Sequence, residues 1–384
     1  MPKTRLDCLW NKPSCTRGYR AGVSLHSHTN LSKEGLQFIP EFAGKFPVLK
    51  WALNRKCNRA VVPVDFDRAY WTPPLTPRQS LELESKQIEN TLGLAGIISL
   101  TDHDNFDASK LLRLIPQASP VPYSLEWSVP FRGTLFHLGI HNLPECKAEG
   151  IMADLSAYTR NPKEARMKEL LSALDQEPDV LVVFNHPLWK QRETTGLRHA
   201  QFVDQFLEEN HELLHAIELN GTRSWKENYP VLQMAERWKL PAVSGGDRHA
   251  TEPSAALNLT CAETFTEFIH EIRGDGLSHM VFMPQYHDPV TLRMTRFLLD
   301  IVRYYPENPV GSRRWDDRVF HPGRPREVMQ PLSALWRKPP EIITKAFSLI
   351  SLVEKDSVGN ALRMMMAQDE GVPRPTDFPS EAIW

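Results

Sequence analysis

The sequence lacks several features that would assign it to a class at once. Its five cysteines are odd in number and irregularly spaced, so they form neither a disulfide framework nor a paired CxxC metal motif. No apolar run approaches the roughly 18 residues of a membrane-spanning helix. The first fifteen residues contain no apolar segment of signal-peptide length. These absences predict a cytoplasmic protein without a membrane partner.

Neither sign of charge dominates the composition. The chain has 45 basic and 47 acidic residues and a formal net charge of −2, so it has no general attraction to nucleic acid. Extended nucleic-acid binding is therefore not expected. With 384 residues, the chain is long enough for one large domain or two medium ones. Nothing in the composition indicates an oligomeric state.

Short apolar runs alternate with helical patterns along most of the chain. Eight runs predict buried strands: 21–25, 95–100, 120–125, 134–140, 180–184, 216–219, 241–245 and 280–283. Thr76 and Pro77 form a helix start, an N-cap residue followed by proline at the first position. The alternation favours a parallel α/β architecture, with a closed barrel as the leading expectation. A doubly wound open sheet is the alternative, but no Gly-rich nucleotide-binding motif follows a strand.

Two segments exceed a minimal barrel. Residues 36–75 form an insertion rich in Pro, Trp and Phe, which we expect on the ligand-binding face as a lid or substrate wall. Residues 291–384 form a C-terminal, mainly helical extension, with helices predicted at 290–305 and from about Glu341 and Asp356. Its Arg-rich stretch 313–326 also contains acidic residues, which favours a solvated loop. The barrel domain then spans residues 18–290.

Histidines and carboxylates gather at the ends of the predicted strands. The histidines in these positions are His26, His28, His103, His137, His186 and His249. The carboxylates are Asp102, Asp104, Glu126, Glu218 and Asp247. In an α/β barrel the C-terminal strand ends open onto one face, and residues i and i+2 of a strand point the same way. Imidazole and carboxylate without thiolate are ligands that suit Zn, Mn or Fe.

The order of the motifs adds a resemblance to a known family. The motifs are LHSHT (25–29), LTDHDN (100–105), SLEWS (124–128), FHLGI (136–140), FNHP (184–187), IELNG (217–221) and GGDRH (245–249). This series resembles the PHP (polymerase and histidinol phosphatase) family over about residues 20–290. The resemblance implies a distorted (β/α)7-type barrel, one strand fewer than the apolar runs suggest, and a di- or trinuclear metal site that cleaves phosphoesters.

The resemblance also implies a set of metal ligands. The first metal would be held by His26, His28, Glu126 and Asp247. Glu126 would bridge to a second metal, which is completed by His137 and His186. The third would be held by Glu34, His103 and His249. Glu34 stands where the family commonly has aspartate, which leaves the occupancy of the third position open.

Such a site would hydrolyse a phosphoester with a metal-activated hydroxide. Asp247 is the expected proton acceptor, and Asp102 is expected to orient an imidazole. Arg223 and Arg248 are candidates for binding the phosphate of the substrate. The expected cofactors are two or three divalent ions (Zn, Mn or Fe). The expected substrate is a small phosphomonoester, a nucleotide or the end of an oligonucleotide.

Three other interpretations compete with this one. An amidohydrolase-like metal hydrolase acting on a C–N or C–O bond also begins with an HxH motif, but no lysine ends a predicted strand here. A non-catalytic barrel would bind metal ions through the same ligands but would not catalyse a reaction. His211, Glu212 and His215 form a literal HExxH, the signature of zinc proteases. This motif leads into the start of a predicted strand, opposite the ligand-binding face, so we expect helix-end residues without a metal.

Overall fold

The computed structural model describes residues 3–36, 68–115, 121–189, 196–322, 328–335 and 373. Most of the insertion 36–75 and the helices predicted from Glu341 and Asp356 lie outside these residues.

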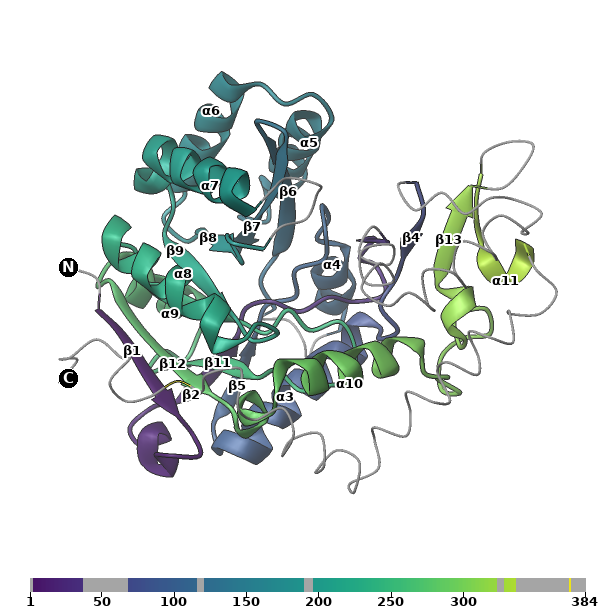
Figure 1. Ribbon diagram of the computed structural model, residues 1–384, viewed down its shortest axis with the longest axis horizontal. Helices are drawn as coiled ribbons and strands as arrows, with labels where there is room; N and C mark the ends of the chain where they lie inside the picture. The colour runs from purple at the N-terminus through teal and green to yellow at the C-terminus, as the bar shows by residue number, and fades with distance from the viewer. Residues whose placement is uncertain are drawn as a thin grey trace.

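The described strands form three sheets (Figure 1). The first sheet has the order β1 (Lys3–Cys8), β12 (Leu277–Phe282), β11 (Ala256–Thr260), β2 (Ala21–Ser24), β5 (Ala95–Ile98). The second has the order β10 (Ala242–Gly245), β9 (Ala216–Asn220), β8 (Leu181–Asn185), β7 (Thr134–His141), β6 (Leu125–Phe131). The third is small, with the order β14 (Met329–Pro331), β13 (Val319–Pro322), β4 (Tyr70–Trp71), β3 (Glu34–Gly35).

Helices connect and cover these sheets. The α-helices are α3 (Pro77–Leu92), α4 (Asp107–Arg113), α5 (Ala148–Arg160), α6 (Glu164–Asp175), α7 (Gly196–Asn210), α8 (Trp225–Trp238), α9 (Phe265–Arg273), α10 (Val290–Val302) and α11 (Leu332–Leu335). Short 3₁₀ turns are η1 (Pro13–Thr16), η3 (His211–Leu213), η4 (Pro284–His287) and η5 (Trp315–Asp317). The predicted start of α3 is confirmed, because Thr76 and Gln79 form a reciprocal capping box. Among the described residues, none of the helices has both the length and the apolar character to span a membrane.

The strand directions are mixed, unlike the parallel arrangement that we predicted. β8, β9 and β10 run parallel, but β7 is antiparallel to both β6 and β8. β6 and β7 are joined by Arg132 and Gly133, which both have positive φ. Two such residues form a tight hairpin turn, which is too short for the crossover that parallel strands require. The predicted strand 120–125 begins only at Leu125.

The two five-stranded sheets meet at single bridges and do not close into a continuous barrel within the described residues. One bridge joins His103 to Glu126, and the other joins Ser27 to Arg248. At the second bridge, His28 donates its backbone N–H to the carbonyl of Arg248 at 2.7 Å. The predicted α/β class is therefore confirmed, with mixed in place of parallel strands, and a closed barrel is not. The sheets meet where the predicted metal ligands lie.

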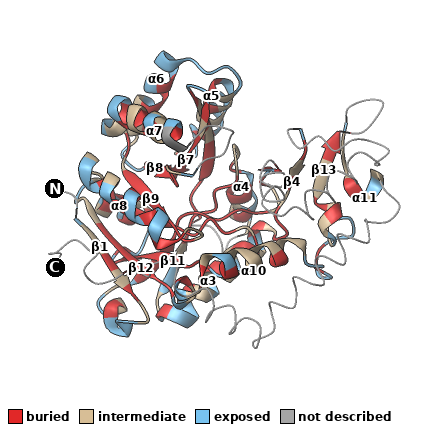
Figure 2. Ribbon diagram, viewed as in Figure 1, coloured by how far each residue is buried: buried red, intermediate tan, exposed pale blue. Residues whose placement is uncertain are grey.

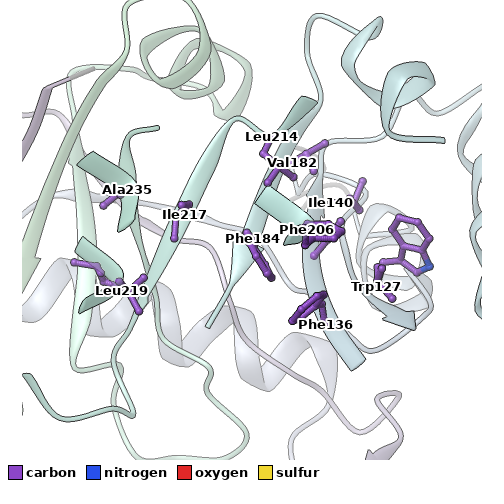
Figure 3. Close-up of a cluster of buried hydrophobic side chains, with 14 of the residues drawn as sticks. Trp127, Phe136, Ile140, Val182, Phe184, Phe206, Leu214, Ile217, Leu219 and Ala235 are labelled. Carbon is purple, nitrogen blue, oxygen red and sulfur yellow. The ribbon is translucent and has the colours of Figure 1, made fainter. Parts of the chain in front are cut away.

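A large apolar core fixes the second sheet from its outer side. Phe136, Phe184 and Phe206 lie together (Figure 3), with ring centroids 5.0–5.2 Å apart, and all three are buried. Figure 2 shows the same pattern in the second sheet, since β8 and β9 are buried while α6 and α7 keep exposed outer faces. Strands packed in this way hold the polar side chains at their ends in fixed positions.

Candidate metal centre

The predicted metal ligands lie in one cluster at the junction of the two sheets. Except for His137, which is placed by its contact with Glu126, they supply imidazole nitrogens and carboxylate oxygens that form several overlapping groups of candidate ligand atoms. Most of these side chains are almost completely buried, and those of His103 and His249 are 14% and 11% exposed. The residues in the cluster are His26, His28, Glu34, His103, Glu126, His137, His186, Asp247 and His249.

Glu126 on β6 is the centre of this cluster. Its Oε2 atom lies 3.1 Å from His26 Nε2 and 3.4 Å from His28 Nε2. Asp247, just after β10, faces the same two nitrogens through Oδ1, at 3.7 and 3.6 Å. His26 Nε2 and His28 Nε2 are themselves 3.0 Å apart. These four residues, which we call the first cluster, are those predicted to hold the first metal.

The other oxygen of Glu126 faces a different pair of histidines. Oε1 lies 3.2 Å from His137 Nδ1 and 3.0 Å from His186 Nε2. Asn185 also donates its side-chain amide to this oxygen at 3.0 Å. Glu126, His137 and His186 form the second cluster. One carboxylate therefore faces both clusters, as the predicted bridging role requires.

Glu34 on β3 is placed in a third cluster with His103 and His249. Its Oε2 atom lies 3.2 Å from His103 Nε2 and 3.3 Å from His249 Nε2. Its Oε1 atom lies 3.5 Å from Nδ1 of His28, whose Nε2 faces the first cluster. The side chain of Glu34 thus reaches both histidines with which the sequence analysis grouped it.

The residues of the cluster fit divalent cations. Burial alone would raise the pKa of Glu126, but His26, His137 and His103 outweigh it and hold this pKa well below its ordinary value. The pKa of His28 falls to about 4, because of burial and because of the nearby His249, so this ring keeps a lone pair. Against the effect of burial, Glu34 and Glu126 raise the pKa of His103 to about 10, and Glu126 and Glu218 raise that of His26, so cations bound there would displace protons from these two rings. His103 Nδ1 is buried without a hydrogen-bond partner among the described residues. Ionised carboxylates and imidazole lone pairs without thiolate suit Zn, Mn or Fe.

Glu218 on β9 supports the first cluster, a role that the sequence did not assign. His26 donates from Nδ1 to Glu218 Oε2 at 2.7 Å, which leaves Nε2 to face the cluster. Asn220 donates its amide both to Glu218, at 2.7 Å, and to Asp247 Oδ2, at 3.1 Å. A Cβ at Gly245 would lie 2.2 Å from the Glu218 carboxylate, so this position needs glycine. The available sequence signal was a carboxylate and an amide two residues apart at a strand end.

Asp102 holds a loop and not an imidazole, which corrects the sequence-based expectation. Its carboxylate accepts the backbone N–H and the hydroxyl of Thr29, both at 2.6 Å. Burial raises the pKa of Asp102 to about 7. Ser32 continues this support, since its hydroxyl donates to Glu34 at 2.5 Å and accepts the backbone N–H of His103 at 3.1 Å. The loop between His28 and Glu34 is thereby fixed by side chains.

Two residues of the cluster have an unusual backbone conformation. His186 has a φ of 27° and Asp247 a φ of 46°, in a region that non-glycine residues rarely adopt. Each lies just past the end of a strand, where the positive φ turns the chain away from the sheet. Strain of this kind persists where the surroundings enforce it, and it is concentrated at functional sites.

The two candidate arginines are placed very differently. The Arg223 guanidinium lies 4.4 Å from the ring centroid of Trp189, and its buried Nε has no hydrogen-bond partner among the described residues. Burial lowers the pKa of Arg223, and the charge of Asp247 opposes this effect. The Arg248 guanidinium instead lies 3.4 Å from Glu84 and donates to the carbonyls of residues 250 and 251. These contacts assign Arg248 to holding its own loop.

The HExxH residues make structural contacts. His211 packs on Trp238, with ring centroids 4.8 Å apart. His215 donates from Nε2 to Asp175 at 3.0 Å and accepts the backbone N–H of Val182 on Nδ1 at 2.9 Å. Within the described ranges, neither histidine belongs to a group of converging ligand atoms.

Comparisons with known proteins add little to this geometry. No family model matches the chain, and no curated protein matches it. One similar solved structure is an amidohydrolase from Chromobacterium violaceum with bound sulfate and no metal; it has 13% identity and a TM-score of 0.35, over 59% of this chain and 87% of that one. Another, described as a metal-dependent phosphoesterase from Bifidobacterium adolescentis, has 14% identity and a TM-score of 0.31, over 52% of this chain and 91% of that one. Similarity at this level carries no weight for fold or function.

Proposed function

We propose that this chain is a metal-dependent phosphoesterase of the PHP type, with two or three divalent ions in its centre. The observation that carries this proposal is the convergence of the predicted ligands on Glu126. They come from strand ends and loops between residues 26 and 249, yet their ligand atoms lie 3.0–3.7 Å from neighbours in the cluster. Separate sequence motifs converge in this way when a fold is built around shared cations.

We infer that seven strands correspond to the distorted barrel that the resemblance implies. They would be β2, β5, β6, β7, β8, β9 and β10. Two single bridges, at His103–Glu126 and Ser27–Arg248, take the place of continuous strand pairing. This correspondence accounts for the position of the centre, since barrel enzymes place their sites at the ends of strands.

The first, second and third clusters would each hold one ion. Ions there would supply Lewis acidity, by offsetting charge on phosphoryl oxygens and making water more acidic. Glu126, facing the first two clusters with different oxygens, would set their separation. Glu218 would keep His26 oriented through the Nδ1 hydrogen bond.

Asp247 and Arg223 would contribute directly to catalysis. Asp247 is a buried member of the first cluster, and Asn220 holds its Oδ2 atom, so it is positioned to take up a proton from the attacking water. Arg223 would donate to the phosphate, because its Nε is buried near Asp247 without a hydrogen bond among the described residues. The substrate would be a small phosphomonoester, a nucleotide or an oligonucleotide end.

Hydrolysis of simple phosphoesters tests the proposal. The purified chain, loaded with Mn²⁺ or Zn²⁺, should release p-nitrophenol from p-nitrophenyl phosphate or from bis(p-nitrophenyl) phosphate, and a chelator should stop the reaction. Cleavage of amides or carboxylic esters without phosphoester turnover would support the amidohydrolase alternative. Full metal content with no turnover of any of these substrates would support a non-catalytic role.

A further inference from the structure

The third cluster depends on segments outside the two five-stranded sheets. β3, which contains Glu34, pairs with β4 from the end of the insertion, and Glu34 lies opposite Trp71. β4 pairs in turn with β13 of the C-terminal extension, where Val319 lies opposite Trp71. Figure 1 shows this small sheet beside the α/β body, with α10 running toward it. Glu34 is thus on the edge strand of a sheet whose other strands come from the insertion and the extension.

Helix α10 of the extension holds the loop that carries His249. The Asp300 carboxylate accepts the backbone N–H of Thr251, the Thr251 hydroxyl at 2.5 Å and the backbone N–H of Glu252 at 2.8 Å. The His249 ring also contacts Phe297 of the same helix, edge to face, with ring centroids 5.4 Å apart. Both the position of this loop and the orientation of the ring therefore depend on α10.

Residues 290–322 of the extension and 68–75 of the insertion act as one support. Trp71 of β4 contacts the His249 ring, with centroids 5.6 Å apart, so the insertion touches both Glu34 and His249. The buried Arg318, just before β13, donates to the carbonyl of Ile301 at the end of α10 at 2.5 Å. Asn308 donates to the carbonyl of Pro74 at 2.7 Å. These contacts connect α10, β13 and residues 68–75.

The ligands of the other two clusters have a different support. Glu126 and His137 lie within β6 and β7. His26 and His186 directly follow the ends of β2 and β8. Their positions depend on the packed five-stranded sheets, whereas Glu34 and His249 depend on the added segments.

We propose that residues 290–322 and 68–75 form part of the third metal position and set its affinity, with Asp300 as a positioning residue. This inference rests on the proposed function in taking the three clusters as metal sites. The position of α10 then controls the occupancy of the third cluster. Changes in α10 should affect the ion in that cluster without disturbing the others.

Metal titration of the full chain tests this inference. Metal-free protein is titrated with Mn²⁺ and the bound ions are counted, for the wild type, Asp300→Ala and the milder Thr251→Val. We expect Asp300→Ala to weaken one class of ion by about 10- to 100-fold, the usual effect of losing an outer support, and to leave the other ions unchanged. Thr251→Val should weaken the same class by less. Asp175→Asn is the control, because Asp175 pairs with Arg273 and His215 away from the centre.

Two results would overturn the inference: equal weakening of all ions, or unchanged affinity for every ion in both variants. If Asp300→Ala does not fold, Thr251→Val decides the matter alone. Turnover is measured separately. A protein that shows the expected metal pattern without hydrolysing phosphoesters would contradict the proposed function and would leave this inference standing.

Discussion

Two regions of this molecule pair histidines with carboxylates, and they differ in what the pairs face. Around Glu126, several imidazoles from separate strands turn their nitrogens toward shared oxygens. At the start of β9, His215 has both ring nitrogens engaged, one with Asp175 and one with the backbone of Val182. The second region carries a recognised zinc-binding motif and the first an ordinary HxH. Convergence from distant segments indicates a metal site better than a short motif does.

Replacing one histidine in each region should give the largest difference in metal content and turnover. His186→Ala takes away a nitrogen 3.0 Å from Glu126, so we expect loss of the second ion and a fall in turnover of more than about 100-fold. His211→Ala removes only a hydrogen bond to the carbonyl of Leu207 and a ring contact, and should leave turnover unchanged. Metal content and phosphoester turnover are measured for both, with circular dichroism to verify folding. An inactive His211→Ala beside an active His186→Ala would reverse the assignment.

The carboxylate that accepts a hydrogen bond from a histidine can be changed in each region, and the effects on metal binding compared. Glu218 accepts from His26 at 2.7 Å and Asp175 accepts from His215 at 3.0 Å, so each can be changed to its amide. Glu218→Gln should weaken metal binding by about 10- to 100-fold. Asp175→Asn should leave metal binding unchanged and lower the free energy of unfolding by about 1 kcal/mol, because its bond with Arg273 weakens. Metal titration and urea denaturation separate the two effects, and similar metal affinities in both variants would remove Glu218 from its supporting role.

Whether Glu34 is a metal ligand can be tested by substitution. Glu34→Gln keeps the shape of the side chain but removes its charge between His103 and His249. We expect the bound metal to fall by about one ion per chain, with the remaining ions retained, as elemental analysis of the purified protein would show. If the variant binds as many ions as the wild type, Glu34 is not a ligand.

The sequence predicted which residues lie near one another where that proximity follows from the order of strands along the chain. Histidines and carboxylates at strand ends could be placed near one another because apolar strands in an α/β fold bring their ends together. The contacts of Arg248 with Glu84 and with the carbonyls of residues 250 and 251 depend on the folded loop, so the sequence could not predict them. Strand direction could not be read from apolar runs, since a two-residue turn at Arg132 and Gly133 decides it. The pairing of β3, β4 and β13 depends on contacts between segments far apart in sequence.

The smallest expected effect concerns acid stability and His215. Burial lowers the pKa of His215 to about 4, and charging the ring would also deprive the Val182 N–H of its acceptor. Between the ordinary histidine value of 6.5 and about 4, the unfolded chain binds a proton that the folded chain does not. Stability therefore falls as the pH is lowered through this interval. His215→Gln should make this fall shallower by at most about one proton, when urea denaturation of metal-free protein is repeated across the interval. An equally steep decline in the variant would show that other groups cause the loss of stability at low pH and that His215 makes no measurable contribution to it.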